Sequence, residues 1–130
     1  MLTPPPLPFH CLRSYDGHVR LFDRRKPLVP LTSVDCEGGI WRTKWHPSRP
    51  DRLLVAAMHP PGGCKVVQFD GLSSEGAFAD GGANGEWAVR FDEHESMAYG
   101  ADWSLGRDEG EGDVVASCSF YDHTLKVWAC

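Results

Sequence analysis

The sequence contains no apolar run that approaches the roughly 20 residues needed to span a bilayer as a helix. No segment shows amphipathic helical spacing, so helices are not predicted. Lys and Arg total 13 against 18 Asp and Glu, and the resulting formal net charge of −5 disfavours nonspecific binding to nucleic acid. The N-terminus lacks the basic start and continuous apolar core of a signal peptide. We therefore expect neither a membrane protein nor a nucleic-acid-binding one.

Several chemical motifs are also missing. The five cysteines form no C-x-x-C pair, so no zinc site is predicted. Reduced thiols indicate a protein of the cytoplasm, and we expect it in the nucleus also. The acidic stretch 108–113 lacks the spacing of a calcium loop, and no G-x-S-x-G motif marks a hydrolase serine. We expect no metal and no cofactor.

One ten-residue phrase occurs twice. Residues 14–23 read SYDGHVRLFD and residues 119–128 read SFYDHTLKVW. Each copy has Tyr-Asp before a tight turn, then an alternation of apolar and basic residues, then a large aromatic residue. This pattern is typical of the closing hairpin of a WD-repeat propeller blade.

The chain of 130 residues is too short for a closed propeller, which needs roughly 4–8 blades of about 40–45 residues. We predict an all-β, incomplete WD-repeat β-propeller with about two and a half blades of about seven. Residues 1–13 are predicted to be a proline-rich, disordered start. Residues 14–130 are predicted to hold a hairpin at 14–23, a blade at about 28–70 and a blade at about 86–128. Missing blades or a partner are needed to close the propeller.

Four phrases carry a family resemblance: GGIWRTKWHP at 38–47, LLVAAMH at 53–59, EHESMAYGADW at 93–103 and CSFYDH at 118–123. They resemble the WD-repeat diphthine methylesterase (diphthine methyltransferase) family of diphthamide biosynthesis, and they fit its C-terminal part. The resemblance implies hydrolysis of the methyl ester of methylated diphthine, a modified histidine on translation elongation factor 2. That protein is then the expected substrate and partner.

In a WD blade, the loop that enters the innermost strand and the turn before the closing strand share one rim. Residues 38–42, 59, 93–99 and 121–123 are therefore expected around one mouth. Ester hydrolysis needs a base and donors to the developing oxyanion. The candidate bases are His59 and His123. The candidate substrate-binding residues are Trp41, Arg42, Tyr99 and Tyr121. Ser96 and Ser119 are nucleophile candidates by position only.

A structural role competes for four other residues. WD blades commonly tie the entry-loop His to a strand Ser or Thr, the turn Asp and the closing Trp. Here that tetrad would be His94, Ser117, Asp122 and Trp128. Because such a network satisfies buried polar groups, we assign these residues to stability rather than catalysis.

The sequence is also compatible with two other functions. Propellers mostly act as binding platforms, so the chain is alternatively a noncatalytic interaction module. A second alternative is a truncated product without independent activity, because open sheet edges invite aggregation. Methanol release from the methylated substrate separates the first reading from the others.

Overall fold

The computed structural model describes residues 9–24, 28–49, 51–58, 63–70, 72–73, 76–77, 84–94, 97–104, 112–121 and 123–130. Every regular element in these residues is a β-strand, which confirms the all-β class. The first sheet consists of β1 (Phe9–Arg13), β2 (His18–Asp23) and β3 (Thr32–Asp35). The middle sheet consists of β4 (Ile40–Trp45), β5 (Arg52–Ala57), β6 (Cys64–Asp70) and β9 (Asn84–Phe91). The third sheet consists of β10 (Ala98–Trp103), β11 (Val114–Ser119) and β12 (Leu125–Ala129), and β7 (Leu72–Ser73) pairs with β8 (Gly76–Ala77).

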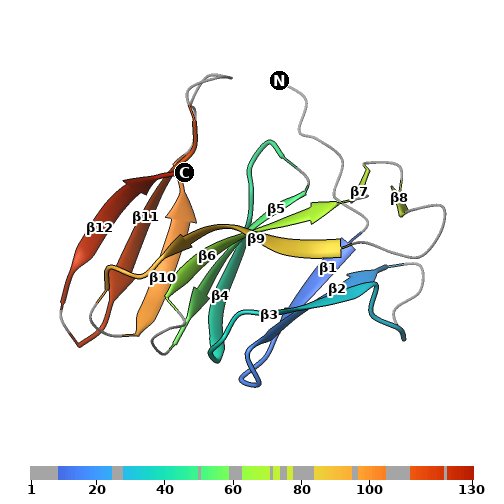
Figure 1. Cartoon of the computed structure of the whole chain (residues 1–130), viewed down its shortest axis with the longest axis horizontal. Helices are drawn as coiled ribbons and strands as arrows, with labels where there is room; N and C mark the ends of the chain where they lie inside the picture. Colours follow the sequence, from blue (N-terminus) through green and yellow to red (C-terminus); the bar gives the residue numbers. More distant parts are fainter. Residues whose placement is uncertain are drawn as a thin grey trace.

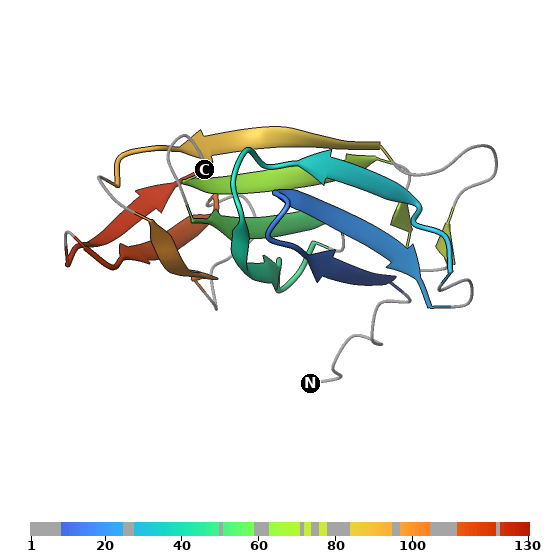
Figure 2. The same ribbon diagram turned by 90° about the horizontal axis from the view of Figure 1, so that it is seen from below.

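The middle sheet lies between the other two, with the first sheet at one side and the third at the other (Figures 1 and 2). One core joins the first and middle sheets and includes Leu21 and Phe69. A second core joins the middle and third sheets and includes Val66 and Trp128. Because both faces of the middle sheet are covered, successive residues of β5 and β6 are buried rather than alternately buried and exposed, and β5 is apolar from Leu53 to Ala57. In the described residues, no closed propeller is present.

The middle and third sheets repeat the same local architecture. In each, the first strand pairs antiparallel with the second and the second with the third. In both sheets, the residue after the second strand also donates a backbone hydrogen bond to the residue before the first strand. Met58 N donates to Gly39 O at 2.7 Å, and Phe120 N donates to Met97 O at 3.3 Å. The two sheets are therefore copies of one supersecondary unit.

The structure corrects the predicted start of the chain. Residues 9–13 were expected to be disordered, but they form β1, which pairs with β2 from Phe9↔Asp23 to Arg13↔Val19. The prolines that motivated the expectation, at positions 4, 5, 6 and 8, precede this strand, and residues 1–8 lie outside the described part of the chain. Proline excludes a central strand only where it stands.

The structure also places two outer strands differently from the sequence assignment. Residues 28–35 were assigned to the middle blade, but β3 pairs with β2 of the first sheet. The strand at 87–91 was assigned to the third blade, but β9 is longer, begins at Asn84 and pairs with β6 of the middle sheet. Each of these two outer strands therefore pairs with the sheet formed by the residues before it in the chain, not with the sheet formed by the residues after it. Apolar alternation identifies a strand but not its partner.

Candidate functional site at the entry edge

Two β-bulges lie at equivalent positions of neighbouring sheets. The pairing of β4 with β5 shifts register between Ile40 and Arg42, and that of β10 with β11 shifts between Ala98 and Gly100. The extra residues are Trp41 and Tyr99, and a bulge re-aims the side chain of such a residue. Their rings meet across the two sheets, with centroids 4.9 Å apart and planes at 58°. We call the edge at which β4 and β10 begin the entry edge.

An aromatic ladder continues along the entry edge from this contact. The Tyr99 ring lies 5.3 Å from that of Phe120, which lies 5.0 Å from that of Tyr121. Phe120 is 56% exposed and Tyr121 is 68% exposed, which is unusual for two adjacent large aromatic residues. The sequence singled out Trp41, Tyr99 and Tyr121, and the structure brings all three into this ladder.

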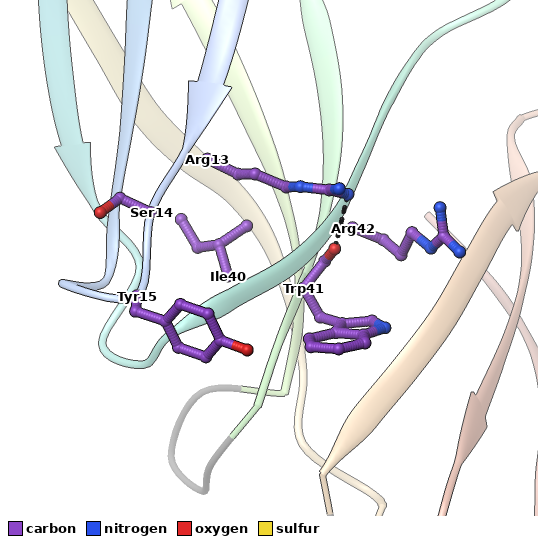
Figure 3. A pocket seen from close by; sticks show the side chains of 6 residues that line it. All are labelled: Arg13, Ser14, Tyr15, Ile40, Trp41 and Arg42. Atoms are coloured by element: carbon purple, nitrogen blue, oxygen red, sulfur yellow. Dashed lines mark hydrogen bonds between the residues drawn. The ribbon is translucent and has the colours of Figure 1, made fainter.

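A hollow of about 210 Å³ lies on the other side of Trp41, between the first and middle sheets. Its lining residues are Arg13, Ser14, Tyr15, Ile40, Trp41 and Arg42. Figure 3 shows the Tyr15 ring turned toward the Trp41 indole and the Arg42 side chain extending toward the third sheet. Arg13 Nη1 donates to Trp41 O at 2.7 Å and so satisfies a carbonyl of the bulge.

The proposed tetrad is present for the three members that the structure describes. Ser117 Oγ lies 2.7 Å from His94 Nε2 and accepts a hydrogen bond from Trp128 Nε1 at 3.0 Å. His94 Nδ1 lies 3.3 Å from Thr124 Oγ1, so both ring nitrogens face hydroxyl groups. His94, Ser117 and Trp128 are all buried, and Asp122 lies outside the described residues. This geometry holds β11 and β12 together and keeps the His94 ring away from solvent.

The candidate bases and nucleophiles differ in exposure and in whether they belong to the described residues. His123 is exposed at the entry edge, and its φ of 53° places it in the left-handed region, which a non-glycine residue adopts only in special turns. Ser119 is buried and its hydroxyl lies 3.1 Å from Thr124 Oγ1, so it does not face a substrate. His59 and Ser96 lie outside the described residues.

The opposite edge of the sheets carries a charged cluster that the sequence analysis missed. Asp113, next to β11, lies 2.7 Å from His46 Nε2 and 2.8 Å from Arg52 Nη1. His46 Nδ1 accepts hydrogen bonds from the backbone N–H groups of Ser48 and Arg49, which assigns the ring proton to Nε2. Burial raises the pKa of Asp113, but the hydrogen bond from His46 and the charge of Arg52 outweigh it and lower the pKa overall. The cluster ties the middle sheet to the third.

Two buried cysteines are unsuited to nucleophilic chemistry. Burial raises the pKa of Cys36 to about 12 and that of Cys64 to about 11, so both thiols stay protonated at neutral pH. Lys65 is fully buried, its Nζ donates to Cys36 O at 2.9 Å and lies 4.6 Å from the Trp87 ring centre. Burial lowers the pKa of Lys65.

Three residues at the entry edge were not found from the sequence: Arg13, Tyr15 and Phe120. Arg13 comes directly before the first copy of the repeated phrase and Tyr15 lies inside it, but their distance from residues 40–42 along the chain gave no sign of contact. Phe120 stands inside the repeated phrase and was treated as part of the hairpin pattern. In the described residues, no helix is long and apolar enough to cross a membrane and no group of His, Cys, Asp or Glu has the arrangement of a metal site.

The stacked sheets and their His–Ser–Trp network define a class of protein: an all-β protein built from repeated antiparallel sheets, with an aromatic and basic entry edge. Sequence comparison supplies the family. The chain is 33% identical over 124 residues to a diphthine methyltransferase homolog of Dictyostelium discoideum, covering 88% of this chain and 30% of that protein. It is 31% identical over 137 residues to the diphthine methyltransferase of Saccharomyces cerevisiae, with the same coverage of 88% and 30%.

A third relative is the diphthine methyltransferase of Homo sapiens, with 36% identity over 94 residues that cover 70% of this chain and 18% of that protein. No family model matches the chain. The chain belongs to the diphthine methyltransferase family. It spans 30% or less of the length of these three relatives.

Proposed function

We propose that the three sheets are blades of a WD-repeat β-propeller that hydrolyses the methyl ester of methylated diphthine on translation elongation factor 2. Family membership motivates the substrate, and the meeting of Trp41 and Tyr99 beside Arg42 at the entry edge carries the assignment of the site. Further blades or a partner chain complete the propeller. The reaction takes place in the cytoplasm, where the substrate protein works in translation.

Hydrolysis adds water to the ester carbonyl and expels methanol, leaving a carboxylate. A base must take a proton from the attacking water, and donors must stabilise the oxyanion that forms. His123, exposed on its left-handed turn, is the described candidate for the base, and His59 is the second. Arg42, Tyr99 and Tyr121 offer N–H and O–H donors at the same edge. The aromatic ladder supplies a surface on which a protein-borne side chain can lie.

The test uses the full-length protein and elongation factor 2 that carries methylated diphthine. Methanol release is measured with and without S-adenosylmethionine, because hydrolysis needs only water whereas methyl transfer from that cofactor adds mass to the protein. We expect release without the cofactor. Arg42→Ala should lower kcat/KM by about 10²-fold, as for loss of an oxyanion donor. His123→Ala should lower kcat by about 10²-fold or more.

Lys44→Ala is the matched control, since Lys44 is an exposed cation two residues from Arg42 on the same strand. Its turnover should equal that of the wild type. Unchanged turnover in the Arg42, Tyr99, Tyr121 and His123 variants would overturn the site assignment. Stoichiometric binding of the substrate without methanol release would favour an interaction module, a role that the exposed Phe120 and Tyr121 also suit.

A further inference from the structure

Two non-glycine residues in the described part of the chain have a left-handed backbone: Glu37, with a φ of 65°, and His123, with a φ of 53°. Glu37 lies in the segment that leads into β4, and His123 lies in the turn between β11 and β12, so both are at the entry edge. This conformation is unfavourable for an L-residue and persists where the surroundings fix it, commonly at a functional site. His123 is a candidate base. Glu37 is not part of the proposed reaction, so its conformation has another cause.

Side chains of β9 hold the entry segment, which we define as residues 35–39. Trp87 Nε1 donates to Asp35 O at 3.1 Å, and Arg90 Nη1 donates to Glu37 Oε1 at 3.2 Å. The backbone N–H of Glu37 in turn donates to Asp35 Oδ1 at 2.8 Å. The outermost strand of the middle sheet therefore fixes both the backbone before Glu37 and the Glu37 side chain.

A buried lysine of β6 adds a third attachment. Lys65 is fully buried, and its Nζ donates to Cys36 O at 2.9 Å, directly before Glu37. The same Nζ lies 4.6 Å from the centre of the Trp87 ring. Because a buried ammonium group is costly unless its contacts compensate, these contacts must be close and well formed. They join the entry segment to the interior of the middle sheet.

Glu37 is the only residue with a side chain between Cys36 and Ile40, since positions 38 and 39 are glycine. Two successive glycines restrict the path of the chain very little. The direction in which this pair leaves the middle sheet is therefore set by the residue before it. The φ of Glu37 and its ion pair provide that restriction.

The far end of the entry segment is fixed by backbone hydrogen bonds. Met58 N donates to Gly39 O at 2.7 Å, and Ile40 N donates to Ser14 O at 3.1 Å. Trp41, the bulged residue, follows directly. The orientation of the bulge thus depends on a segment that is held at both ends, with a side chain as the anchor at only one of them.

We infer that Glu37 is a positioning residue: held in the left-handed conformation by Arg90, it sets the path of the entry segment so that the Trp41 ring meets that of Tyr99. These two ring centroids are 4.9 Å apart. The inference deepens the proposed function and rests on it for the role of Trp41 in binding the substrate. Glutamate is used here instead of glycine because only a side chain can connect the segment to β9.

Glu37→Gly in the full-length protein separates positioning from stability. Loss of an exposed ion pair and relief of left-handed strain have opposite signs, so the melting temperature should change by less than about 2 °C. The 19F resonance of 5-fluorotryptophan at position 41 should nevertheless move toward its position in Tyr99→Leu, which reports loss of the ring contact. Glu86→Gln removes a carboxylate from an exposed position of β9 and should leave the resonance unchanged.

The kinetic test uses elongation factor 2 that carries methylated diphthine. Glu37→Gly should raise KM by about tenfold and leave kcat within about twofold, because it weakens a contact made equally in the ground state and the transition state. A merely structural loss would lower the amount of folded enzyme, and so the apparent kcat, at unchanged KM. Glu86→Gln should match the wild type in both constants.

A double-mutant cycle tests whether Glu37 acts through Arg90. Glu37→Gln and Arg90→Met should each shift the Trp41 resonance, and the double variant should shift it no further than the larger single change. The inference is overturned by an unchanged Trp41 resonance in Glu37→Gly or by additive shifts in the cycle. Absence of methanol release from the wild type would remove the proposed reaction, and the Trp41 resonance would then decide the positioning role alone.

Discussion

The middle and third sheets fill the same three positions with opposite chemistry. The strand register aligns the two sheets residue by residue. Three aligned positions are compared: one before the first strand, one in the second strand and one in the third strand. The middle sheet has Cys36, Val55 and Val67 there, and the third sheet has His94, Ser117 and Trp128. All six are buried. One arrangement packs apolar groups, and the other satisfies polar groups with each other.

This difference shows that the architecture does not depend on the polar network. Apolar packing contributes without direction, whereas each hydrogen bond contributes only about 0.5–1.5 kcal/mol net but costs more when one partner is lost. The middle sheet, covered on both faces, can rely on packing. The third sheet leaves Leu125 and Val127 more than two thirds exposed, at 72% and 67%, and its network compensates for the missing contact.

Two lysines at aligned positions of the two sheets also differ in their surroundings. Lys65 pairs with Val55 and Lys126 pairs with Ser117, so the two lysines occupy the same register. Lys65 is fully buried beneath Trp87 of β9, whereas Lys126 is half-buried. A fourth strand therefore turns a surface lysine into a buried one that must donate to a carbonyl.

The largest expected effect comes from breaking the polar arrangement. Ser117→Ala removes the group that joins His94 Nε2 and Trp128 Nε1, and it should lower the free energy of unfolding by about 2–4 kcal/mol. Urea denaturation measures the loss. Ser33→Ala, on the exposed side of β3, should cost less than about 0.5 kcal/mol. Equal losses in the two variants would show that the network adds nothing to stability.

A smaller effect is expected when a polar group enters the apolar arrangement. Val55→Thr keeps the shape but buries a hydroxyl beside Cys36 and Val67, at a cost of about 1–3 kcal/mol. Val127→Thr makes the same change on the exposed face of β12 and should stay within about 0.5 kcal/mol. The measurement is the midpoint of thermal unfolding of each variant, compared with that of the wild type. If Val55→Thr were neutral, the middle sheet would already accept a polar group at that position.

The smallest expected effect concerns the Asp113 cluster, which ties the two sheets together. Because the pKa of Asp113 is lower in the folded state, its ionised form stabilises the fold above the ordinary value of 3.8. That contribution is lost as the pH falls through the lowered value. Asp113→Asn should lower the melting temperature at pH 6, and the difference from the wild type should shrink below about pH 4. A constant difference down to pH 2.5 would mean that the ionised carboxylate does not contribute.

Much of the fold was predictable from local pattern. The strand at 40–45 follows from alternation after a Gly-Gly turn, the strand at 52–57 follows from an apolar run, and the strand at 64–70 follows from the turn before it. The third hairpin follows from its repeated phrase. The partners of β3 and β9 were not predictable, because both strands pair with the sheet before them. The strand at residues 9–13 was missed because the prolines before it dominated the interpretation.

The candidate site was predictable only in part. The blade pattern identified four residues at the entry edge: Trp41, Arg42, Tyr99 and Tyr121. The ring contacts place the three aromatic residues in one ladder. Arg42 lines the hollow next to this ladder. Arg13 and Tyr15 could not be identified, since they reach Trp41 only through the turn that Gly17 and the Gly38–Gly39 pair allow.

By itself, the sequence determined an all-β chain of repeated hairpins and a family, because strand alternation, turn residues and specific phrases are local properties. The tertiary structure decided which strands share a sheet, which lysine is buried, and that two bulged aromatic residues 58 positions apart meet at one edge. These are consequences of register and sheet stacking, which depend on contacts between segments distant in the chain.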